Sequence, residues 1–154
     1  MNKRNTNNSV RIMTIMYVVF LVYMLIGRNV SVWSNALMSE VMPYRINIVP
    51  FRTIREYIEM LFVSDINKDI PLMNLLGNLF MFFPMGFLLP LYKKNKNCKN
   101  FILSMMSILI FKEFLQFVCG KAVFDIDDII LNMIGAIIAF FIWNVVVFRK
   151  KRVS

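Results

Sequence analysis

Three acids open the last long apolar run of the chain, and their type and spacing could serve chemistry. Asp125, Asp127 and Asp128 are followed by Asn132, one helical turn beyond Asp128. Carboxylates at the edge of a membrane are costly and usually face a protein interior or a water-filled cavity, so they indicate a functional site. Closely spaced carboxylates can act as general acid and general base, or hold a hard cation such as Mg²⁺ or Ca²⁺ through oxygen.

Further polar residues lie near the ends of two other apolar runs. Asn74 and Asn78 stand near the start of one run, and Glu113 and Gln116 near the end of the next. Each pair has helical spacing and so shares one helix face. If successive runs cross a membrane in alternating directions, these ends lie on the same side as the acids, and we expect a shallow polar pocket there. The candidate ligand-binding residues are Asn47, Arg52, Asn74, Asn78, Glu113, Gln116, Asp125, Asp128 and Asn132.

The apolar runs predict an all-α integral membrane protein. Of the 154 residues, 58% are hydrophobic. Four stretches, about 12–27, 72–92, 101–118 and 129–148, approach the roughly 20 residues that a helix needs to cross a bilayer. We therefore expect four transmembrane helices in a single domain, residues 12–148, embedded in the cell membrane.

The distribution of basic residues predicts the orientation of these helices. Eleven of the 18 Lys and Arg residues fall in the tails 1–11 and 149–154 and in the loop 93–100, and no acid accompanies them. By the positive-inside rule, both tails are cytoplasmic and the loop 28–71 is outside. The net charge of +9 then reflects orientation and contact with anionic lipid, and binding of nucleic acid is not expected.

The outer loop contains a predicted amphipathic helix at about 51–63. Pro50 fits its first helical position. Apolar residues recur at helical spacing, and the opposite face offers two i,i+4 ion pairs, Arg52–Glu56 and Arg55–Glu59. We expect this helix to lie in the outer membrane interface. A helix that merely caps the bundle is the alternative, and the two roles are compatible.

The second and fourth runs contain residues that shape helices. Pro84 and Pro90 should kink the second helix, because proline cannot donate a backbone hydrogen bond. Gly77 and Gly86, like Gly135 in the last run, should permit another backbone to approach closely.

Four charged residues carry specific expectations. Lys112 should point away from the face that Glu113 shares with Gln116 and reach outward to the membrane surface. Asp127 or Asp128 should cap the N-terminus of the last helix, where a carboxylate is favourable. Lys121, in the short loop before the acids, is a candidate partner for anionic groups.

The composition excludes several kinds of site. The chain has no histidine and two cysteines, which removes Ser-His-Asp and Cys-His catalysis and leaves too few ligands for a zinc or iron–sulfur centre. Cys98 and Cys119 are expected on opposite sides of the membrane, so a disulfide between them is excluded. We expect no cofactor and no bound metal.

Three interpretations of the polar residues remain open. The side chains could cap helices and join them. They could bind a polar ligand, in which case arginine or lysine takes anionic groups and the acids take cationic groups or hydroxyls. They could be catalytic, with Glu113, Asp125, Asp127 and Asp128 as candidates. Their spacing selects no reaction, so we favour binding over catalysis. A small transporter is disfavoured because the inner halves of the runs carry no charged residue.

Four segments, in this order and spacing, resemble the VanZ family. They are Asn47-Ile-Val-Pro-Phe, Asn74-Leu-Leu-Gly-Asn78-Leu-Phe-Met-Phe-Phe-Pro84-Met-Gly86, Glu113-Phe-Leu-Gln116, and Phe124-Asp-Ile-Asp-Asp128-Ile-Ile-Leu-Asn132-Met-Ile-Gly135-Ala. The resemblance extends from the first apolar run to the last. It departs from the family pattern at one point, where a basic residue closely precedes the Phe-Asp pair; here Lys121 is separated from Phe124 by two residues.

The resemblance implies a small bacterial integral membrane protein. Founding members of the family are linked to low-level resistance to teicoplanin-type lipoglycopeptides, without the ligase that rewrites the peptidoglycan precursor. Many relatives stand outside resistance clusters, and no agreed catalytic mechanism comes with the family. The partners expected on this basis are the lipid bilayer and a lipid-linked cell-wall precursor, an envelope polymer or a lipoglycopeptide. The alternative is an enzyme that modifies an envelope lipid or polymer.

Overall fold

The computed structural model describes residues 3–26, 46–63, 67–92, 97–118 and 124–153. Helices account for most of this part of the chain, as the apolar runs predict, and two short strands join them. In chain order the elements are α1 (Lys3–Ile26), β1 (Ile46–Asn47), α3 (Arg52–Phe62), α4 (Asp69–Met81), α5 (Phe83–Tyr92), α6 (Cys98–Val118), β2 (Phe124–Asp125) and α7 (Ile126–Val153).

Within the described part of the chain, three helical segments are long and apolar enough to cross a membrane: Asp69–Leu91, Cys98–Val118 and Ile126–Val146. They confirm the expected class, an all-α membrane protein. The apolar part of α1, Val10–Met24, is shorter. At 1.5 Å per residue it reaches only about 22 Å, less than the ~30 Å hydrocarbon core. The first of the four predicted spans therefore stays a prediction.

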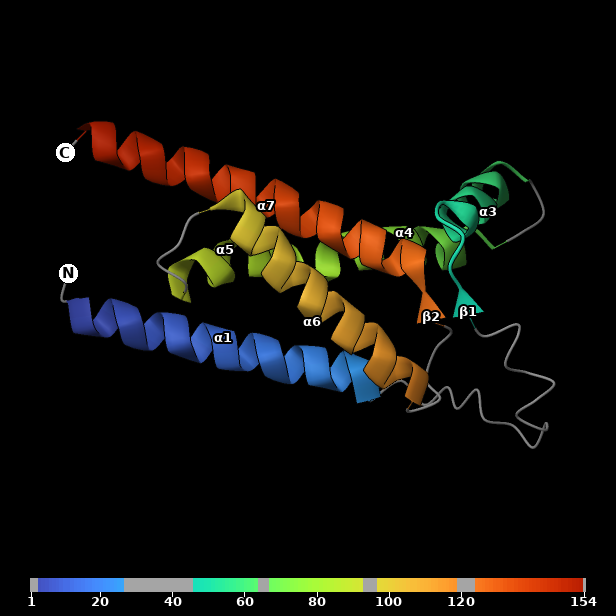
Figure 1. Ribbon diagram of the computed structural model, residues 1–154, viewed down its shortest axis with the longest axis horizontal. Helices are drawn as coiled ribbons and strands as arrows, with labels where there is room; N and C mark the ends of the chain where they lie inside the picture. The colour runs from blue at the N-terminus through green and yellow to red at the C-terminus, as the bar shows by residue number, and fades with distance from the viewer. Residues whose placement is uncertain (1–2, 27–45, 64–66, 93–96, 119–123, 154) are drawn as a thin grey trace.

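Helix α7 is the centre of the bundle and packs against α4, α5 and α6. Figure 1 shows α7 running the length of the molecule. The core is formed by Phe82, Phe101, Met105, Leu109, Ile129, Met133, Ala136 and Phe140. Within it, the rings of Phe101 on α6 and Phe140 on α7 stack with their centroids 4.3 Å apart. Any side chain at the start of α7 is therefore held by a firmly packed helix.

Two glycines let α7 approach its neighbours closely. A Cβ atom on Gly135 would lie 1.8 Å from the backbone oxygen of Leu79, and one on Gly86 would lie 2.4 Å from the oxygen of Ala136. Both predicted close contacts are confirmed. The same prediction for Gly77 is wrong, since no described atom lies within 4 Å of its added Cβ. Gly135 brings α4 against α7 where the polar residues of the two helices meet.

The second span is broken at Phe82, between α4 and α5, with φ −99° and ψ 5°. Pro84 is the second residue of α5, which confirms the expected interruption there; Pro90 lies inside α5. The amide of Met85 bonds to the oxygen of Phe82, and the oxygen of Met81 accepts the hydroxyl of Tyr17 at 2.8 Å. Tyr17 thus satisfies a carbonyl near the break and ties α1 to the bundle.

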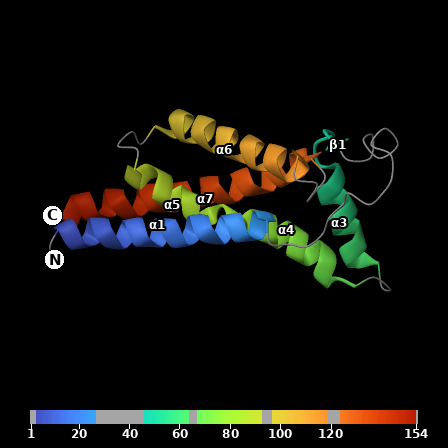
Figure 2. The same ribbon diagram turned by 90° about the horizontal axis from the view of Figure 1, so that it is seen from below.

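The start of α1 and the end of α7 lie at one end of the bundle, and α3, β1 and β2 lie at the other (Figure 1). Seen from below, α3 crosses that end beside α4 (Figure 2). Strands β1 and β2 pair in parallel, with Ile46 opposite Phe124 and Asn47 opposite Asp125. This pairing joins the segment before α3 to the acids at the start of α7.

Candidate functional site

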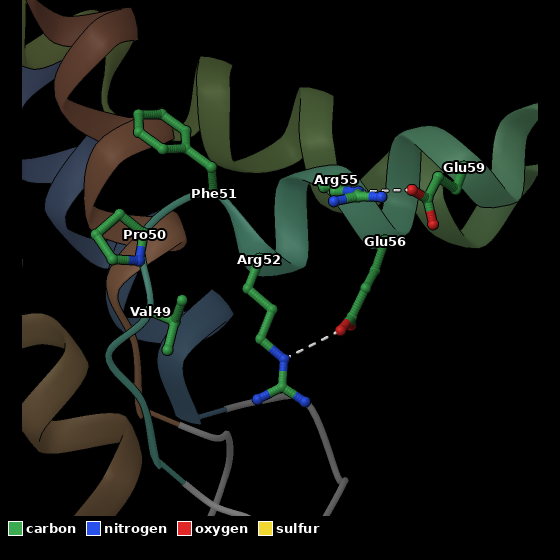
Figure 3. Close-up of a pocket in the computed structure, with 7 residues that line it drawn as sticks. All are labelled: Val49, Pro50, Phe51, Arg52, Arg55, Glu56 and Glu59. Carbon is green, nitrogen blue, oxygen red and sulfur yellow. Dashed lines mark hydrogen bonds and ion pairs between the residues drawn. The ribbon is translucent and has the colours of Figure 1, made fainter.

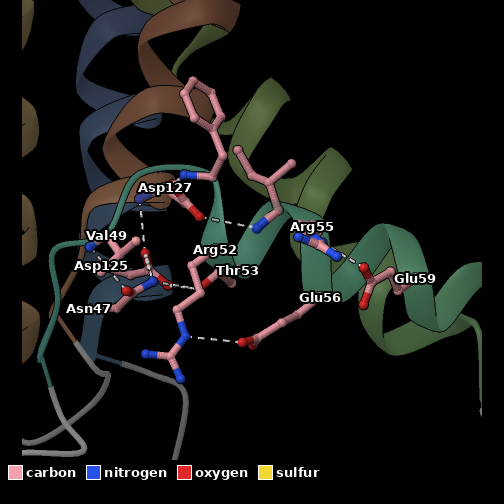
Figure 4. A network of polar contacts seen from close by, with 11 residues as sticks. Asn47, Val49, Arg52, Thr53, Arg55, Glu56, Glu59, Asp125 and Asp127 are labelled. Carbon is pink, nitrogen blue, oxygen red and sulfur yellow. Dashed lines mark hydrogen bonds and ion pairs between the residues drawn. The ribbon is translucent and has the colours of Figure 1, made fainter.

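Asp125 joins the loop before α3 to the start of α7. Asn47 donates from Nδ2 to Oδ1 of Asp125 at 3.1 Å and to Oγ1 of Thr53 at 2.8 Å. Thr53 in turn donates its hydroxyl to Oδ2 of Asp125 at 2.6 Å. Figure 4 shows these contacts converging on the Asp125 carboxylate. The strand register explains the arrangement, because it sets Asn47 directly beside Asp125.

Asp125 is also the residue that caps α7. Its Oδ1 accepts the backbone N–H of Asp127 at 2.9 Å. The helix begins at Ile126, so Asp125 occupies the N-cap position, where a side-chain oxygen meets a free amide of the first turn. The prediction that Asp127 or Asp128 caps this helix is wrong, because α7 starts earlier than the apolar run alone suggests.

Asp127 caps a different helix, α3. Its Oδ1 accepts the backbone N–H of Phe51 at 2.6 Å, and its Oδ2 accepts that of Ile54 at 3.1 Å. A carboxylate is favoured at this place by the free amides and the dipole of a helix N-terminus. Phe51 has φ 65° and ends the turn before α3, which begins at Arg52. Pro50 therefore precedes the helix by two residues and does not take its first position.

Asp128 turns to the interior and meets α4. Asn78 donates from Nδ2 to Oδ1 of Asp128. Asn132 donates from Nδ2 to the backbone oxygen of Asp128 at 2.6 Å and to Oδ1 of Asn78 at 3.5 Å. Asn132 is wholly buried. Three predicted site residues are thus in contact, and a side-chain hydrogen bond links two membrane helices.

Glu113 and Lys112 form a buried ion pair on α6. Their exposed fractions are 1% and 5%, and Lys112 donates from Nζ to Oε1 of Glu113. The prediction that Lys112 reaches outward is wrong. A carboxylate that is taken out of water needs a nearby positive charge, and Lys112, the preceding residue, supplies this charge to Glu113. Both residues interact electrostatically with Asp128, so the pair lies near Asp128.

These contacts define two groups of polar side chains. The outer network contains Asn47, Thr53, Asp125 and Asp127. The inner cluster contains Asn78, Lys112, Glu113, Asp128 and Asn132. The outer network fastens α3 and β1 to α7, whereas the inner cluster lies among the apolar spans. Among the described residues, no group of three or more acids and cysteines could hold a metal ion.

The remaining predicted site residues that the structure describes form no hydrogen bond with the two groups. Asn74 donates from Nδ2 to the oxygen of Ile70 in its own helix at 2.8 Å. Arg52 is largely exposed and pairs with Glu56 at 3.1 Å, as the helical spacing predicts; Arg55 and Glu59 pair at 2.7 Å. Gln116 is half-buried. Lys121 lies outside the described residues.

Two residues of α3 belong near the site and were not predicted. Thr53 is part of the outer network, and Tyr57 follows it by one helical turn. Burial raises the pKa of Tyr57 above its ordinary value, and the carboxylates of Asp128 and Asp125 raise it further. The phenol therefore stays protonated beside the acids and keeps its O–H donor. The i,i+4 spacing of two hydroxyls on an otherwise apolar face was the signal that could have revealed them.

An open depression lies on the far side of α3 from the acids. It has a volume of ≈ 560 Å³ and is lined by Val49, Pro50, Phe51, Arg52, Arg55, Glu56 and Glu59. Figure 3 shows its two ion pairs lying along the helix surface. None of the three acids of α7 and β2 lines it. Helix α3 therefore separates an exposed, charge-paired surface from the buried polar groups.

No curated protein and no solved structure matches the chain. A family model described as VanZ/LLP1 matches residues 14–148. The match spans the bundle from α1 to α7 and includes both groups of polar side chains. The chain therefore belongs to the VanZ/LLP1 family.

Proposed function

We propose that this membrane protein binds the polar head group of a cell-envelope lipid or lipid-linked molecule at the outer face of the membrane, and thereby lowers susceptibility to teicoplanin-type lipoglycopeptides. One observation carries the proposal. Asp128, Asn78 and Asn132 bond to one another among apolar helices, at the end of the bundle away from the start of α1. Buried acids in such a place are costly and serve binding more readily than packing.

The surface of α3 supports a lipid as the bound molecule. Phe51 and Phe62 are 61% and 81% exposed, and Ile58 between them is 44% exposed. Ile58 and Phe62 lie four residues apart on α3 and share one stripe, between the face that packs on α4 and the face that carries the ion pairs; Phe51 precedes the helix. Such a helix fits a membrane interface, with its apolar stripe in lipid and its charges in water. An acyl chain on this stripe would bring its head group to the acids.

The placement of charge supports an outward-facing site. Eleven of the 18 basic residues flank the opposite end of the spans, and by the positive-inside rule that end is cytoplasmic. The end with α3 and the acids then faces outward. A lipoglycopeptide acts at that face, so a protein that holds an envelope molecule there limits access to it.

The proposal is tested with Asp128→Asn and Glu113→Gln in a host that lacks the protein. We expect both variants to lose protection against teicoplanin while they accumulate in the membrane like the wild type. Glu56→Gln, an exposed acid on α3, is the matched control and should keep protection. Full protection by both cluster variants, measured as the minimal inhibitory concentration, would overturn the proposal.

A further inference from the structure

The inner cluster has hydrogen-bond acceptors without donors. Among the described residues, Oε2 of Glu113 and Oδ1 of Asn132 are buried and have no hydrogen-bond partner. The two side chains are 1% and 0% exposed. Oε1 of Gln116, on the same face of α6 as Glu113, is buried and unpartnered as well. Buried polar atoms are nearly always paired, so these three acceptors call for a donor. The backbone N–H of Asp125 acts on the Glu113 carboxylate, but no described group forms a hydrogen bond with Oε2.

The same region has more negative than positive charge. In the outer network, Asp125 and Asp127 are each compensated by the free amides of a helix N-terminus. In the inner cluster, Glu113 and Asp128 share a single cation, Lys112, which bonds to Glu113. Asp128 accepts its hydrogen bond from the neutral amide of Asn78. Among the described residues, one carboxylate of the inner cluster therefore lacks a cation of its own.

A single chemical group can supply both the missing hydrogen-bond donors and the missing positive charge. A primary ammonium carries one positive charge and three N–H donors. A quaternary ammonium has the charge and no N–H donor, and a hydroxyl has one donor and no charge. Asp128 and Gln116 are partly exposed, so they connect the buried acceptors with the surface of the bundle.

We infer that the inner cluster binds a primary ammonium group, held by Glu113, Asp128 and Asn132. The inference rests on the proposed function and adds to it the chemical class of the head group. Carboxylate hydrogen bonds to an ammonium are charge-assisted and shorter than those between neutral groups. The cluster thus distinguishes an amine-bearing head group from one that is only cationic or only anionic.

The test uses the full-length protein in nanodiscs made of equal parts phosphatidylethanolamine, phosphatidylcholine and phosphatidylglycerol with identical acyl chains. Native mass spectrometry counts the lipids that remain on the released protein. We expect retention of phosphatidylethanolamine above both others, and we expect Glu113→Gln to reduce this preference about tenfold or more, as the loss of a hydrogen bond to a charged group predicts. Glu56→Gln should leave it unchanged. Soluble ethylamine added to the same mixed nanodiscs identifies the source. Displacement of phosphatidylethanolamine by ethylamine assigns the ammonium to a soluble molecule, and its retention in the presence of ethylamine assigns the ammonium to a lipid.

Two results would overturn the inference. One is equal retention of phosphatidylethanolamine and phosphatidylcholine by the wild type. The other is an unchanged preference in both Glu113→Gln and Asn132→Leu when thermal unfolding shows that each is folded. Teicoplanin susceptibility of the same variants separates the two proposals. If the variants lose protection but the wild type shows no preference for phosphatidylethanolamine, the ammonium inference is wrong and the proposed function stands. If the variants keep full protection, the proposed function is wrong.

Discussion

Asp125, Asp127 and Asp128 are close in sequence and have different partners. The Asp125 carboxylate accepts hydrogen bonds from the side chains of Asn47 and Thr53. The Asp127 carboxylate accepts them from backbone N–H groups at the start of α3, and the Asp128 carboxylate accepts one from the side chain of Asn78. The reason is helical geometry, because successive residues at the start of α7 point about 100° apart. One short segment thereby fastens α3 through two acids and directs the third into the inner cluster. Their substitutions should have separable effects.

Removal of the Asp127 carboxylate should loosen α3 without affecting the inner cluster. The amides of Phe51 and Ile54 would lose their acceptor. Loss of a helix cap costs about 1 kcal/mol, so we expect Asp127→Ala to speed tryptic cleavage after Arg52 and Arg55 about fivefold. Glu59→Ala, on the exposed face of the same helix, is the control. Equal cleavage rates for Asp127→Ala and wild type would show that the cap does not hold α3.

The raised pKa of Tyr57 gives a pH dependence. A folded-state pKa above the unfolded value means that the native state favours the neutral phenol. The associated stability is fully present below the ordinary tyrosine pKa of about 10 and is lost as pH rises through the folded-state pKa. We expect the tyrosinate absorbance of native protein, minus that of Tyr57→Phe, to appear only above pH ~10. Titration of Tyr57 at or below its ordinary pKa would contradict the location of its hydroxyl beside the acids.

At the scale of elements, α7 owes its position to contacts between backbones. Gly135 meets Leu79 of α4, and Gly86 of α5 meets Ala136. Small residues at helix contacts are typical of membrane bundles, where close packing replaces the hydrophobic effect as the driving force. The Gly135 contact lies one turn beyond Asn132 and one residue from Asn78. Packing and the inner cluster are therefore coupled at one crossing.

A methyl group at this crossing should separate α4 from α7. The Cβ of Gly135→Ala would meet backbone, which cannot move aside cheaply, so we expect a loss of about 1–3 kcal/mol in the free energy of unfolding. Gly77→Ala is the matched control on α4. It has open space among the described residues and should gain up to about 1 kcal/mol from helix propensity. Unfolding in mixed micelles measures both; equal stability of the two variants would refute the close contact.

Local sequence patterns predicted three of the spans, the break near Pro84, both ion pairs of α3 and the position of Asn78 on the same side as the acids. Each depends on hydropathy, helical spacing or side-chain chemistry. Asp127 was assigned to the wrong helix because its partners are the backbone amides of Phe51 and Ile54, which carry no side-chain signal. The prediction for Lys112 was wrong because it used only helical spacing, which puts Lys112 and Glu113 on different faces. The long, flexible lysine side chain can still fold back to a buried carboxylate.

At the scale of the whole molecule, the two ends of the bundle differ in chemistry. One end holds α3, the outer network and the inner cluster. The other end, with the starts of α1 and α6 and the end of α7, carries most of the basic residues of the described helices. A protein with this polarity has a distinct working face, and orientation decides which compartment that face meets. The proposed function requires it to be outside, where lipoglycopeptides and lipid-linked envelope molecules are found.

Orientation is measured by thiol labelling of intact cells with a membrane-impermeant maleimide, in a background with Cys98→Ser and Cys119→Ser. Glu59→Cys places a thiol on the exposed face of α3, and Lys99→Cys places one at the exposed start of α6, near the opposite end. The positive-inside rule predicts that Glu59→Cys is labelled on intact cells and that Lys99→Cys is labelled only after permeabilisation. The reverse pattern would turn the inner cluster to the cytoplasm. An envelope ligand at the outer face could then not reach it, and the loss of protection expected for Asp128→Asn would need a cytoplasmic cause.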